Sequence, residues 1–452
     1  MNNEKRTNVR FYVILMVLIT GIILFADRNL LPTIAKPLMH ALDISPATLG
    51  WIFSCFSIVY VACQIPGGWL LDRFGSRKIV TLSFVGMAIV NILQGFVTFY
   101  SGVWVLISFC ILRGVIGFLE TPGVPAFIRV ITTWCPLKEK GLAGSLAGAA
   151  QYMAVFVFVP FFAWFASAYN FQKLFFVIGI LELLIAWLFY KSTPAPAHHP
   201  KVNQAELDYI REGGGLPDMD IKKKEKKAQK VVEWTDIKAF ITNRQTIGIF
   251  ISQYCFNCLA LFFLSWFPMY LMTERGIDIK ATGILVAIPA FGAFVGGLSS
   301  GALSDFLMRK TSSLTISRKT PIYIGMLCSF SMFFCNYVDS IYLVVALMTL
   351  AYFGKGCSTL GWVILTDVAP KKIISTAGGI FNAFSNISTI VTPIVIGYIV
   401  NYTGSFTWAL IFVSAHALLA LLSYLVIVWP IKRIEVDPNE EISVSASEPV
   451  KE

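Results

Sequence analysis

Long apolar runs recur from one end of the chain to the other and constrain its fold more than any other feature. Each run has about the 20 residues that a helix needs to cross a bilayer. Hydrophobic residues make up 56% of the chain and charged residues only 14%, which excludes an ordinary soluble domain. The sequence therefore predicts an all-α polytopic membrane protein. We expect twelve transmembrane helices, at about 11–33, 47–70, 78–98, 102–131, 141–165, 171–190, 245–272, 281–304, 320–337, 341–366, 374–400 and 405–430.

Basic residues in the connections predict the orientation, because Lys and Arg are held on the cytoplasmic side. One side has Lys5, Arg6, Arg10, Arg73, Arg77, Lys78, Arg129, Lys138, Lys140, Arg309, Lys310, Arg318, Lys319, Lys371, Lys372, Lys432 and Arg433. The other side has only Lys36, Lys173, Arg275 and Lys280. We expect both termini to be cytoplasmic. The net charge of +10 then reflects topology and a lipid-facing surface, with no nucleic-acid partner.

A polar segment divides the chain into two halves. We expect an N-terminal six-helix bundle at 1–191, a cytoplasmic linker loop at 192–244, a C-terminal six-helix bundle at 245–431 and a cytoplasmic tail at 432–452. The linker contains a basic block at 222–227.

An internal repeat supports this division. The pattern Gly68-x-x-x-Asp72 recurs 233 residues later as Gly301-x-x-x-Asp305, and Pro160 and Pro393 are separated by the same 233 residues. Such agreement predicts two parallel six-helix pseudo-repeats, an architecture in which substrate binds near the membrane midplane between the repeats.

Cysteine and metal chemistry is not indicated. The nine cysteines show no disulfide framework, and we interpret Cys255 and Cys258, a CxxC inside an apolar run, as packing residues. There is no metal-ligand cluster, no phosphate-binding GxxxxGK[ST] segment and no nucleophile with a base and an oxyanion hole. We expect no cofactor, no metal and no enzymatic activity.

Charged residues inside the apolar runs indicate function instead. Asp27 and Arg28 lie in the first run, where each charge near the bilayer centre costs about 2.5–3.5 kcal/mol. Neighbours on a helix project about 100° apart, so we expect this pair to have different partners.

A second acid and a second arginine lie in the fourth run. Arg113 and Glu120 are seven residues apart, which places them on one face but about 10 Å apart along the helix, and Pro122 and Pro125 are expected to bend the chain beside Glu120. Burial disfavours the charged form of a carboxyl, so Asp27 and Glu120 are candidate proton-binding groups. A purely structural buried ion pair is the alternative.

Charges beside the repeated Gly-x-x-x-Asp pattern suggest a cytoplasmic gate that opens and closes. The alternative is a solvated turn whose basic residues only set the topology. The candidate gate residues are Gly68, Asp72, Arg73, Gly75, Arg77, Arg129, Asp305 and Arg309.

These residues resemble a known family. GGWLLDRFGSRK is similar to the loop signature of the major facilitator superfamily, and the resemblance covers nearly the whole chain. ADRNLL, YVACQIPGGWLLDRFGSRK, LRGVIGFLETPGVP and QAELDYIREGGG resemble its anion:cation symporter branch. FGKGCSTLGWVILTDVAPKKI and FNAFSNISTIVTPIVIGYIV look most like bacterial glucarate and galactarate permeases, with galactonate and hexuronate permeases somewhat further away.

The resemblance implies roles for individual residues. It implies proton coupling for Asp27, Glu120 and Arg113, with Arg113 linking proton and substrate, and it implies that Arg28 holds a substrate carboxylate. The other implied substrate-binding residues are Tyr60, Gln151, Trp362, Asn382, Ser385 and Asn386. Asn386 could instead form an interhelical hydrogen bond.

Lys355 suggests a second carboxylate on the substrate. It lies seven residues before Trp362, near the same helix face, so a second cation would join Arg28 in the cavity if Trp362 faces the substrate. A lysine that extends its ammonium toward a helix end is the alternative. Phe25, Phe127 and Leu261 depart from the family pattern by removing possible polar or stacking contacts, and Glu182 has no recognised counterpart.

The sequence thus predicts a monomeric transporter of the bacterial inner membrane that imports a sugar acid with protons by alternating access. The proton is the coupling ion, and the substrate is an aldarate such as glucarate or galactarate, or an aldonate or hexuronate. The main alternative is an organic anion or organic phosphate exchanger without proton coupling. A drug exporter would favour a more apolar cavity without Arg28, and a membrane enzyme or non-transporting receptor is the least favoured class, because no nucleophile, base and oxyanion constellation is present.

Overall fold

The computed structural model describes residues 6–97, 103–217, 234–370, 373–428 and 430–434, and all regular secondary structure among them is helical. Several predictions concern residues outside these ranges, namely Lys5, Lys371, Lys372, the basic block 222–227 and the tail from residue 435.

Helices follow every predicted apolar run. In the first half they are α1 (Val9–Thr33), α3 (Pro46–Ala62), α4 (Gln64–Phe74), α5 (Ser76–Val97), α6 (Val103–Glu120), α7 (Gly123–Trp134), α8 (Leu137–Ala168) and α9 (Phe171–Ser192). In the second half they are α12 (Arg244–Leu261), α13 (Phe267–Thr273), α14 (Ile279–Thr311), α15 (Leu314–Ser329), α16 (Ile341–Gly356), α17 (Leu360–Val368), α18 (Ile374–Thr403) and α19 (Thr407–Leu422). Short helices α2 (Ala35–Leu42), α10 (Gln204–Glu212) and α11 (Trp234–Thr242) lie in the connections.

Ten helical segments of the described chain are long and apolar enough to cross a membrane. An eleventh is added if α2 and α3, which meet at 119°, form one span. Two predicted runs are helical but divided. The run 47–70 breaks between α3 and α4, just before Pro66 and Gly67, and the run 320–337 continues from α15 as a 3₁₀ helix over Phe330–Tyr337.

Proline and small residues divide other spans as well. The helix is interrupted beside Glu120, where we expected a bend, because α6 ends at Glu120 and α7 begins at Gly123, after Pro122. The run 341–366, which we expected to be one helix, is interrupted by a 3₁₀ turn at Cys357–Thr359 that separates α16 from α17. Lys355 therefore lies in the last turn of α16 and Trp362 in the first turn of α17.

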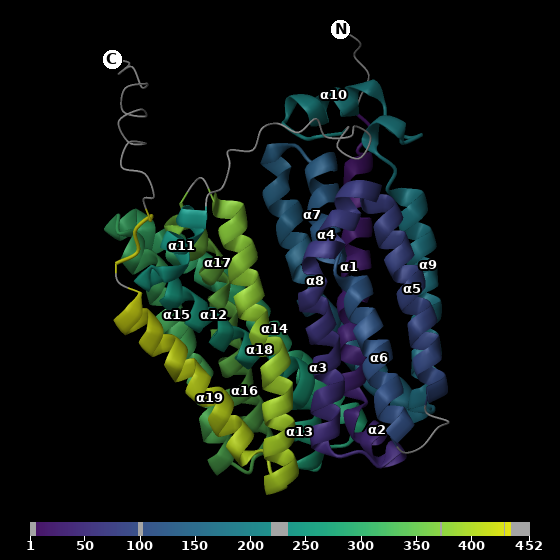
Figure 1. Ribbon diagram of the computed structural model, residues 1–452, viewed down its shortest axis with the longest axis vertical. Helices are drawn as coiled ribbons and strands as arrows, with labels where there is room; N and C mark the ends of the chain where they lie inside the picture. Colours follow the sequence, from purple (N-terminus) through teal and green to yellow (C-terminus); the bar gives the residue numbers. More distant parts are fainter. Residues whose placement is uncertain (1–5, 98–102, 218–233, 371–372, 429, 435–452) are drawn as a thin grey trace.

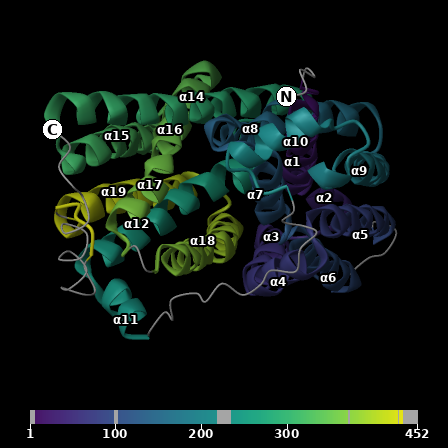
Figure 2. The ribbon, with the colours of Figure 1, turned by 90° about the horizontal axis from the view of Figure 1, so that it is seen from above.

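The helices form two groups that lie side by side (Figure 1). Helices α1–α9 make one group and α12–α19 the other, and the view from above shows α3 beside α18 and α8 beside α14 at their boundary (Figure 2).

Two glycines allow the groups to approach closely. A Cβ on Gly50 of α3 would lie 2.5 Å from the Pro393 carbonyl oxygen on α18, and a Cβ on Gly283 of α14 would lie 3.0 Å from the Pro160 Cα on α8. Gly50 and Gly283 are separated by the same 233 residues as Pro160 and Pro393, so the two contacts are equivalent under the repeat.

Hydrogen bonds between the groups gather toward the end of the molecule that carries α2 and α13, opposite the linker helix α10 (Figure 1). Lys36 Nζ donates to the Met272 carbonyl at 2.5 Å, and Ser54 Oγ donates to the Ile390 carbonyl at 2.9 Å. Nearer the linker end, Asn382 Nδ2 donates to Gln64 Oε1 at 3.0 Å.

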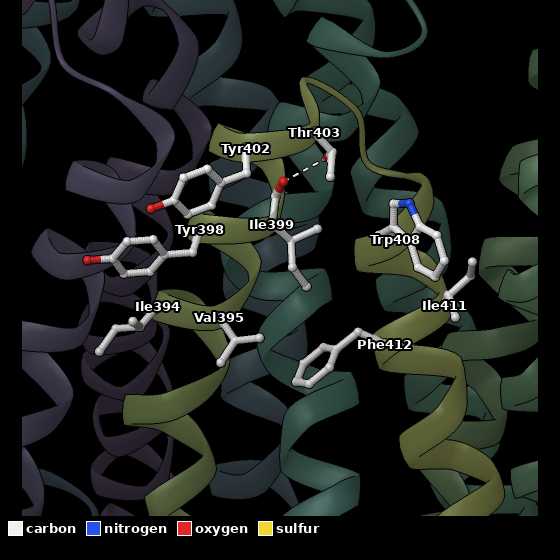
Figure 3. A pocket seen from close by; sticks show the side chains of 9 residues that line it. All are labelled: Ile394, Val395, Tyr398, Ile399, Tyr402, Thr403, Trp408, Ile411 and Phe412. Carbon is white, nitrogen blue, oxygen red and sulfur yellow. Dashed lines mark hydrogen bonds between the residues drawn. The ribbon is translucent and has the colours of Figure 1, made fainter.

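Aromatic side chains mark the ends of the spans. Figure 3 shows Tyr398, Tyr402 and Trp408 around an apolar hollow of about 600 Å³ between α18 and α19. Tyr402 and Trp408 are strongly exposed, as are Tyr337 and Tyr342 at the connection before α16. Tyr and Trp favour the membrane–water interface, so these positions fit one edge of the bilayer.

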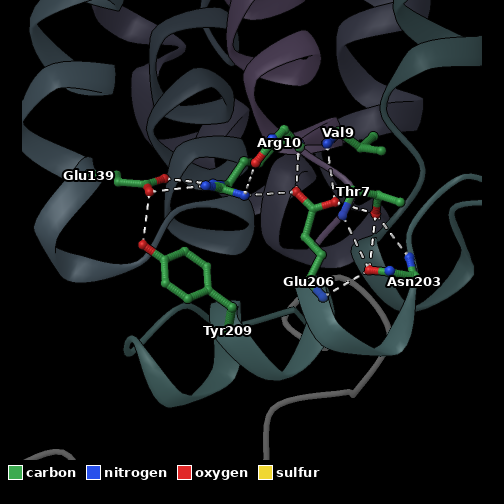
Figure 4. Close-up of polar contacts among 8 residues, drawn as sticks. Thr7, Val9, Arg10, Glu139, Asn203, Glu206 and Tyr209 are labelled. Carbon is green, nitrogen blue, oxygen red and sulfur yellow. Dashed lines mark hydrogen bonds and ion pairs between the residues drawn. The ribbon is translucent and has the colours of Figure 1, made fainter. Parts of the chain in front are cut away.

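The linker is not a simple loop, because α10 packs on the first group of helices (Figure 4). Glu206 is fully buried and accepts hydrogen bonds from the Val9 and Arg10 backbone amides at 3.1 Å each, which caps the start of α1. Arg10 in turn pairs with Glu139 near the start of α8, at 2.8 Å. The linker helix thus joins the ends of two spanning helices.

Candidate functional site: a buried acid and arginine cluster

Three helices of the first group, α1, α6 and α9, bring ionisable side chains together inside the membrane-spanning region, and α5 adds the amide of Asn91. Asp27, Glu120 and Glu182 are fully buried, and Arg113 is 4% exposed. The Arg28 side chain is the most accessible member, at 28%. Buried charges are tolerated when they are paired, and the pairing here crosses between helices.

Asp27 faces Arg113. The Arg113 Nη1 atom lies 3.6 Å from Asp27 Oδ2, while Asp27 Oδ1 accepts a hydrogen bond of 2.8 Å from Asn91 Nδ2. Among the described residues, Asp27 Oδ2 and Arg113 Nε have no hydrogen-bond partner. The carboxylate is therefore held by one charge and one amide, and Oδ2, which lies near Arg113 without a hydrogen bond, is the oxygen that could take a proton.

Arg28 faces Glu120. Its Nε atom donates to Glu120 Oε2 at 2.5 Å, and Arg28 Nη2 and Glu120 Oε1 have no hydrogen-bond partner. The guanidinium lies against aromatic rings, 4.8 Å from the Tyr60 centroid and 5.2 Å from that of Phe25. Adjacent residues of α1 thus pair with opposite charges two turns apart on α6.

Glu182 on α9 completes the cluster, although no pattern in the sequence indicated a role for it. Its Oε2 atom accepts a hydrogen bond of 2.9 Å from Asn91 Nδ2, the same nitrogen that donates to Asp27. In the sequence, this contact is indicated by no more than an acid, Glu182, within one apolar run and an amide, Asn91, within another. Their contact depends on the packing of α5 against α9, which no spacing within either run reveals.

The predicted substrate-binding residues lie on both halves. Tyr60 is beside Arg28, and Gln151 on α8 is exposed. In the second half, Trp362 is 43% exposed and packs edge-to-face on Phe381 at 4.9 Å. Lys355 is partly buried, and we find no hydrogen bond or ion pair of its ammonium within the described chain.

Three polar residues of α18 lie together. Asn386 Nδ2 donates to the Asn382 carbonyl at 2.9 Å, and Ser385 Oγ donates to the same carbonyl, also at 2.9 Å. Asn386 thus bonds within its own helix. Interhelical bonds at this level come from Asn382 Nδ2, which donates to Gln64 Oε1 of α4 at 3.0 Å, and from Asn257 Nδ2 of α12, which donates to the Ser385 carbonyl at 3.1 Å.

The candidate gate residues of the first half form interhelical contacts. Asp72 on α4 pairs with Arg129 on α7 at 2.6 Å, and Arg77 Nε donates to the Tyr190 carbonyl of α9 at 2.7 Å. Arg73 lies over the Trp69 ring at 5.2 Å. Gly75 has a φ of 81°, which favours glycine at the sharp link between α4 and α5, whereas a Cβ on Gly68 would meet nothing within 4 Å.

The second half uses different residues at the corresponding end. Asp305 and Arg309 are both exposed, and no ion pair joins them in the described structure. Instead, Arg318 of α15 pairs with Asp367 of α17 at 2.9 Å and also donates to Ser304 Oγ at 2.9 Å. The 233-residue offset matches Asp72 with Asp305, but it matches Arg129, the partner of Asp72, with Trp362, which has no charge.

Among the described residues, no group of three His, Cys, Asp or Glu side chains could hold a metal ion. Cys255 and Cys258 are buried free thiols on α12.

Comparison with known proteins places this arrangement in a family. A family model described as the Major Facilitator Superfamily matches residues 16–335 and 311–450. The chain is 44% identical over 435 residues to the probable galactarate/D-glucarate transporter GudP of Escherichia coli (strain K12), covering 96% of this chain and 97% of that protein. It is 34% identical to the D-galactonate transporter of Escherichia coli O6:H1, covering 96% and 99% of the two chains.

Solved structures agree at the level of the fold. The xylose transporter XylE from E. coli, in its inward open conformation, has a TM-score of 0.67 at 16% identity, covering 96% of this chain and 99% of that one. The predicted fold class is confirmed by these likenesses and by the helical structure. The chain is a multi-pass membrane protein and a transporter rather than an enzyme, and it belongs to the major facilitator superfamily.

Proposed function

We propose that this protein imports sugar acids with protons across the bacterial inner membrane, with both termini in the cytoplasm. The observation that carries the proposal is the crossed pairing of Asp27 with Arg113 and of Arg28 with Glu120. Relatives named as galactarate/D-glucarate and D-galactonate transporters support the substrate class.

The crossed pairs suggest how anion and proton binding are linked. A substrate carboxylate that binds the Arg28 guanidinium competes with Glu120 for its N–H donors. Such competition is possible because Arg28 is the accessible member of the cluster and binds Glu120 through Nε alone. Glu120 then loses its cation in a buried place, which favours its protonation. Anion and proton therefore bind together more readily than either binds alone.

Charge neutralisation then allows the cavity to close. With Arg28 bound to substrate and the acids protonated, less charge must be desolvated when the two halves come together. We take the units 1–191 and 245–431 as the halves that rock, with the linker 192–244 between them. We expect the two halves to rock about the contacts at Gly50 and Gly283, because the backbones of the halves touch there.

A second cation supports a diacid. Within the part of the chain that the structure describes, the Lys355 ammonium has no hydrogen bond or ion pair, which leaves it free for a second carboxylate. Asn382, Gln151 and Tyr60 offer hydrogen bonds to hydroxyls. Trp362, partly exposed, offers an apolar face to the carbon chain.

Uptake into proteoliposomes tests the proposal. Glucarate, galactarate, galactonate and a hexuronate are offered with and without an inwardly directed proton gradient. We expect accumulation of aldarates above equilibrium only with the gradient. Uptake that is indifferent to the gradient, with exchange of internal for external anion, would support the exchanger instead.

A further inference from the structure

Glu182 is the one member of the buried cluster that the proposed mechanism does not use. It is fully buried in α9, its Oε1 atom has no hydrogen-bond partner, and no arginine or lysine forms an ion pair with it in the described structure. An ionised carboxylate in this position would lack any compensating charge, which is unfavourable by several kcal/mol in a protein interior. A group other than a cation must therefore stabilise the buried Glu182 carboxyl.

Asn91 ties Glu182 to Asp27. The single nitrogen Nδ2 donates one hydrogen to Asp27 Oδ1 at 2.8 Å and the other to Glu182 Oε2 at 2.9 Å. Both acids are thus held against one amide, with Asn91 itself fully buried. Two carboxyl groups this close in a buried site cannot both ionise easily, so one proton is shared between them.

The groups that face Glu182 explain where that proton resides. From α1 comes Asp27, from α5 Asn91, and from α6 the more distant Glu120. We find no hydrogen bond or ion pair to Glu182 from α8, the other helix packed on α9, among its described side chains. Arg113 faces Asp27 rather than Glu182, so the cation favours a charged Asp27 and leaves the proton on Glu182.

The cluster as a whole has more acids than cations. Asp27, Glu120 and Glu182 face only Arg28 and Arg113. We propose that Glu182 and Asp27 form an acid pair, bridged by Asn91, in which Glu182 is a positioning residue that sets the proton affinity of Asp27 during transport. This inference rests on the proposed proton coupling.

The pH dependence of uptake tests the acid pair. Glu182→Gln keeps an acceptor for Asn91 but removes the acid that holds the shared proton, so Asp27 then titrates alone beside Arg113. Asp27 should then release its proton more readily, and the pH midpoint of glucarate uptake should move to lower pH by about one unit, with the rate at acidic pH retained. Glu182→Asp, which keeps the carboxyl, should restore the midpoint in part.

A matched control is Glu212→Gln, which removes an exposed acid on the linker helix α10 and should leave the midpoint unchanged. If Glu182→Gln does not fold, Glu182→Met removes the same charge with an apolar side chain of similar length, and the same shift is expected. A wild-type midpoint in either neutral variant overturns the acid pair. A wild-type protein whose uptake ignores pH instead overturns the proposed proton coupling.

Discussion

At the residue scale, the central feature is that neighbours on one helix pair with different partners. Asp27 and Arg28 were predicted as functional from their position in an apolar run, and their different directions follow from helix geometry. The identity of each partner does not follow, because Arg113 and Glu120 could equally have faced each other. That choice is made by the packing of α6 against α3 and α5 and by the end of α6 at Glu120.

Removing one charge at a time separates proton coupling from anion binding. Asp27→Asn should abolish accumulation driven by a proton gradient while leaving glucarate exchange, because the amide cannot carry a proton in and out. Arg28→Lys keeps a cation beside Glu120 but loses the planar fork, so glucarate affinity should fall at least tenfold, or about 1.4 kcal/mol.

Arg28→Ala is the less informative change, since it leaves Glu120 buried without its partner and is expected to destabilise the fold by about 3–5 kcal/mol. Uptake and exchange by each variant, together with its thermal unfolding temperature, check these expectations. If Asp27→Asn and Arg28→Lys both lose exchange to the same degree, the division of roles is wrong.

Lys355 provides a test of substrate choice at the same scale. Lys355→Ala should lower glucarate uptake at least tenfold and leave galactonate uptake nearly unchanged, because only the diacid offers a second carboxylate. Lys310→Ala, which removes an exposed cation near the end of α14, is the control. An equal loss for both acids, or no loss for either, would contradict the second-carboxylate hypothesis.

At the element scale, breaks in helices were the least predictable feature. Hydrophobicity alone predicts continuous spans, whereas Pro66 and Pro122 divide two of them and a 3₁₀ turn divides a third. The linker was likewise expected to be a loop. The linker helix α10 begins at Asn203, whose side chain caps it by accepting a hydrogen bond from the Glu206 amide. The helix is stabilised by Glu206, which caps α1 through the Arg10 amide. Because Glu206 and Arg10 are 196 residues apart, neighbouring sequence does not reveal this contact.

The contact between the linker and the ends of α1 and α8 should depend on pH. Burial by itself raises the pKa of Glu139, but hydrogen bonds from Arg10 and Tyr209 and the positive charge of Arg10 outweigh it and hold the pKa below its usual value. A lowered pKa in the folded state means that the stabilisation is present above the ordinary pKa of 4.5 and is lost as pH falls through the folded value.

Hydrogen exchange of α10 amides measures this directly. Protection should stay constant from neutral pH to about pH 5 and fall at lower pH, whereas Glu139→Gln should exchange faster at all of these pH values. Glu212→Gln on the same helix is the control. Protection of α10 that is unaffected by Glu139→Gln would show that this ion pair does not hold the linker.

At the scale of the whole molecule, the repeat was visible in the sequence, and its meaning became clear only in three dimensions. Pro160 and Pro393 share an offset with the Gly-x-x-x-Asp pattern. In the structure each lies against a glycine of the opposite half, and those glycines share the offset too. The hydrophobic runs predicted the fold class well, but contacts between the halves depend on shape and could not be deduced.

Equivalent substitutions at the two contacts should have equivalent effects. Gly50→Ala and Gly283→Ala each place a Cβ within 3.0 Å of atoms on the opposite half, so each should lower the unfolding temperature and slow uptake, with overpacking costs of about 1–3 kcal/mol. Gly148→Ala on α8, where a Cβ meets nothing within 4 Å, should be tolerated. A defect confined to one of the two contacts would argue against symmetric rocking.

The most direct test of the account is proton movement driven by substrate alone. Proteoliposomes with a pH-sensitive dye inside are given an inward glucarate gradient and no proton gradient. Symport predicts acidification of the interior with wild-type protein, and no acidification with Asp27→Asn even where glucarate exchange persists. Entry of glucarate through the wild-type protein without any change of internal pH would contradict the account.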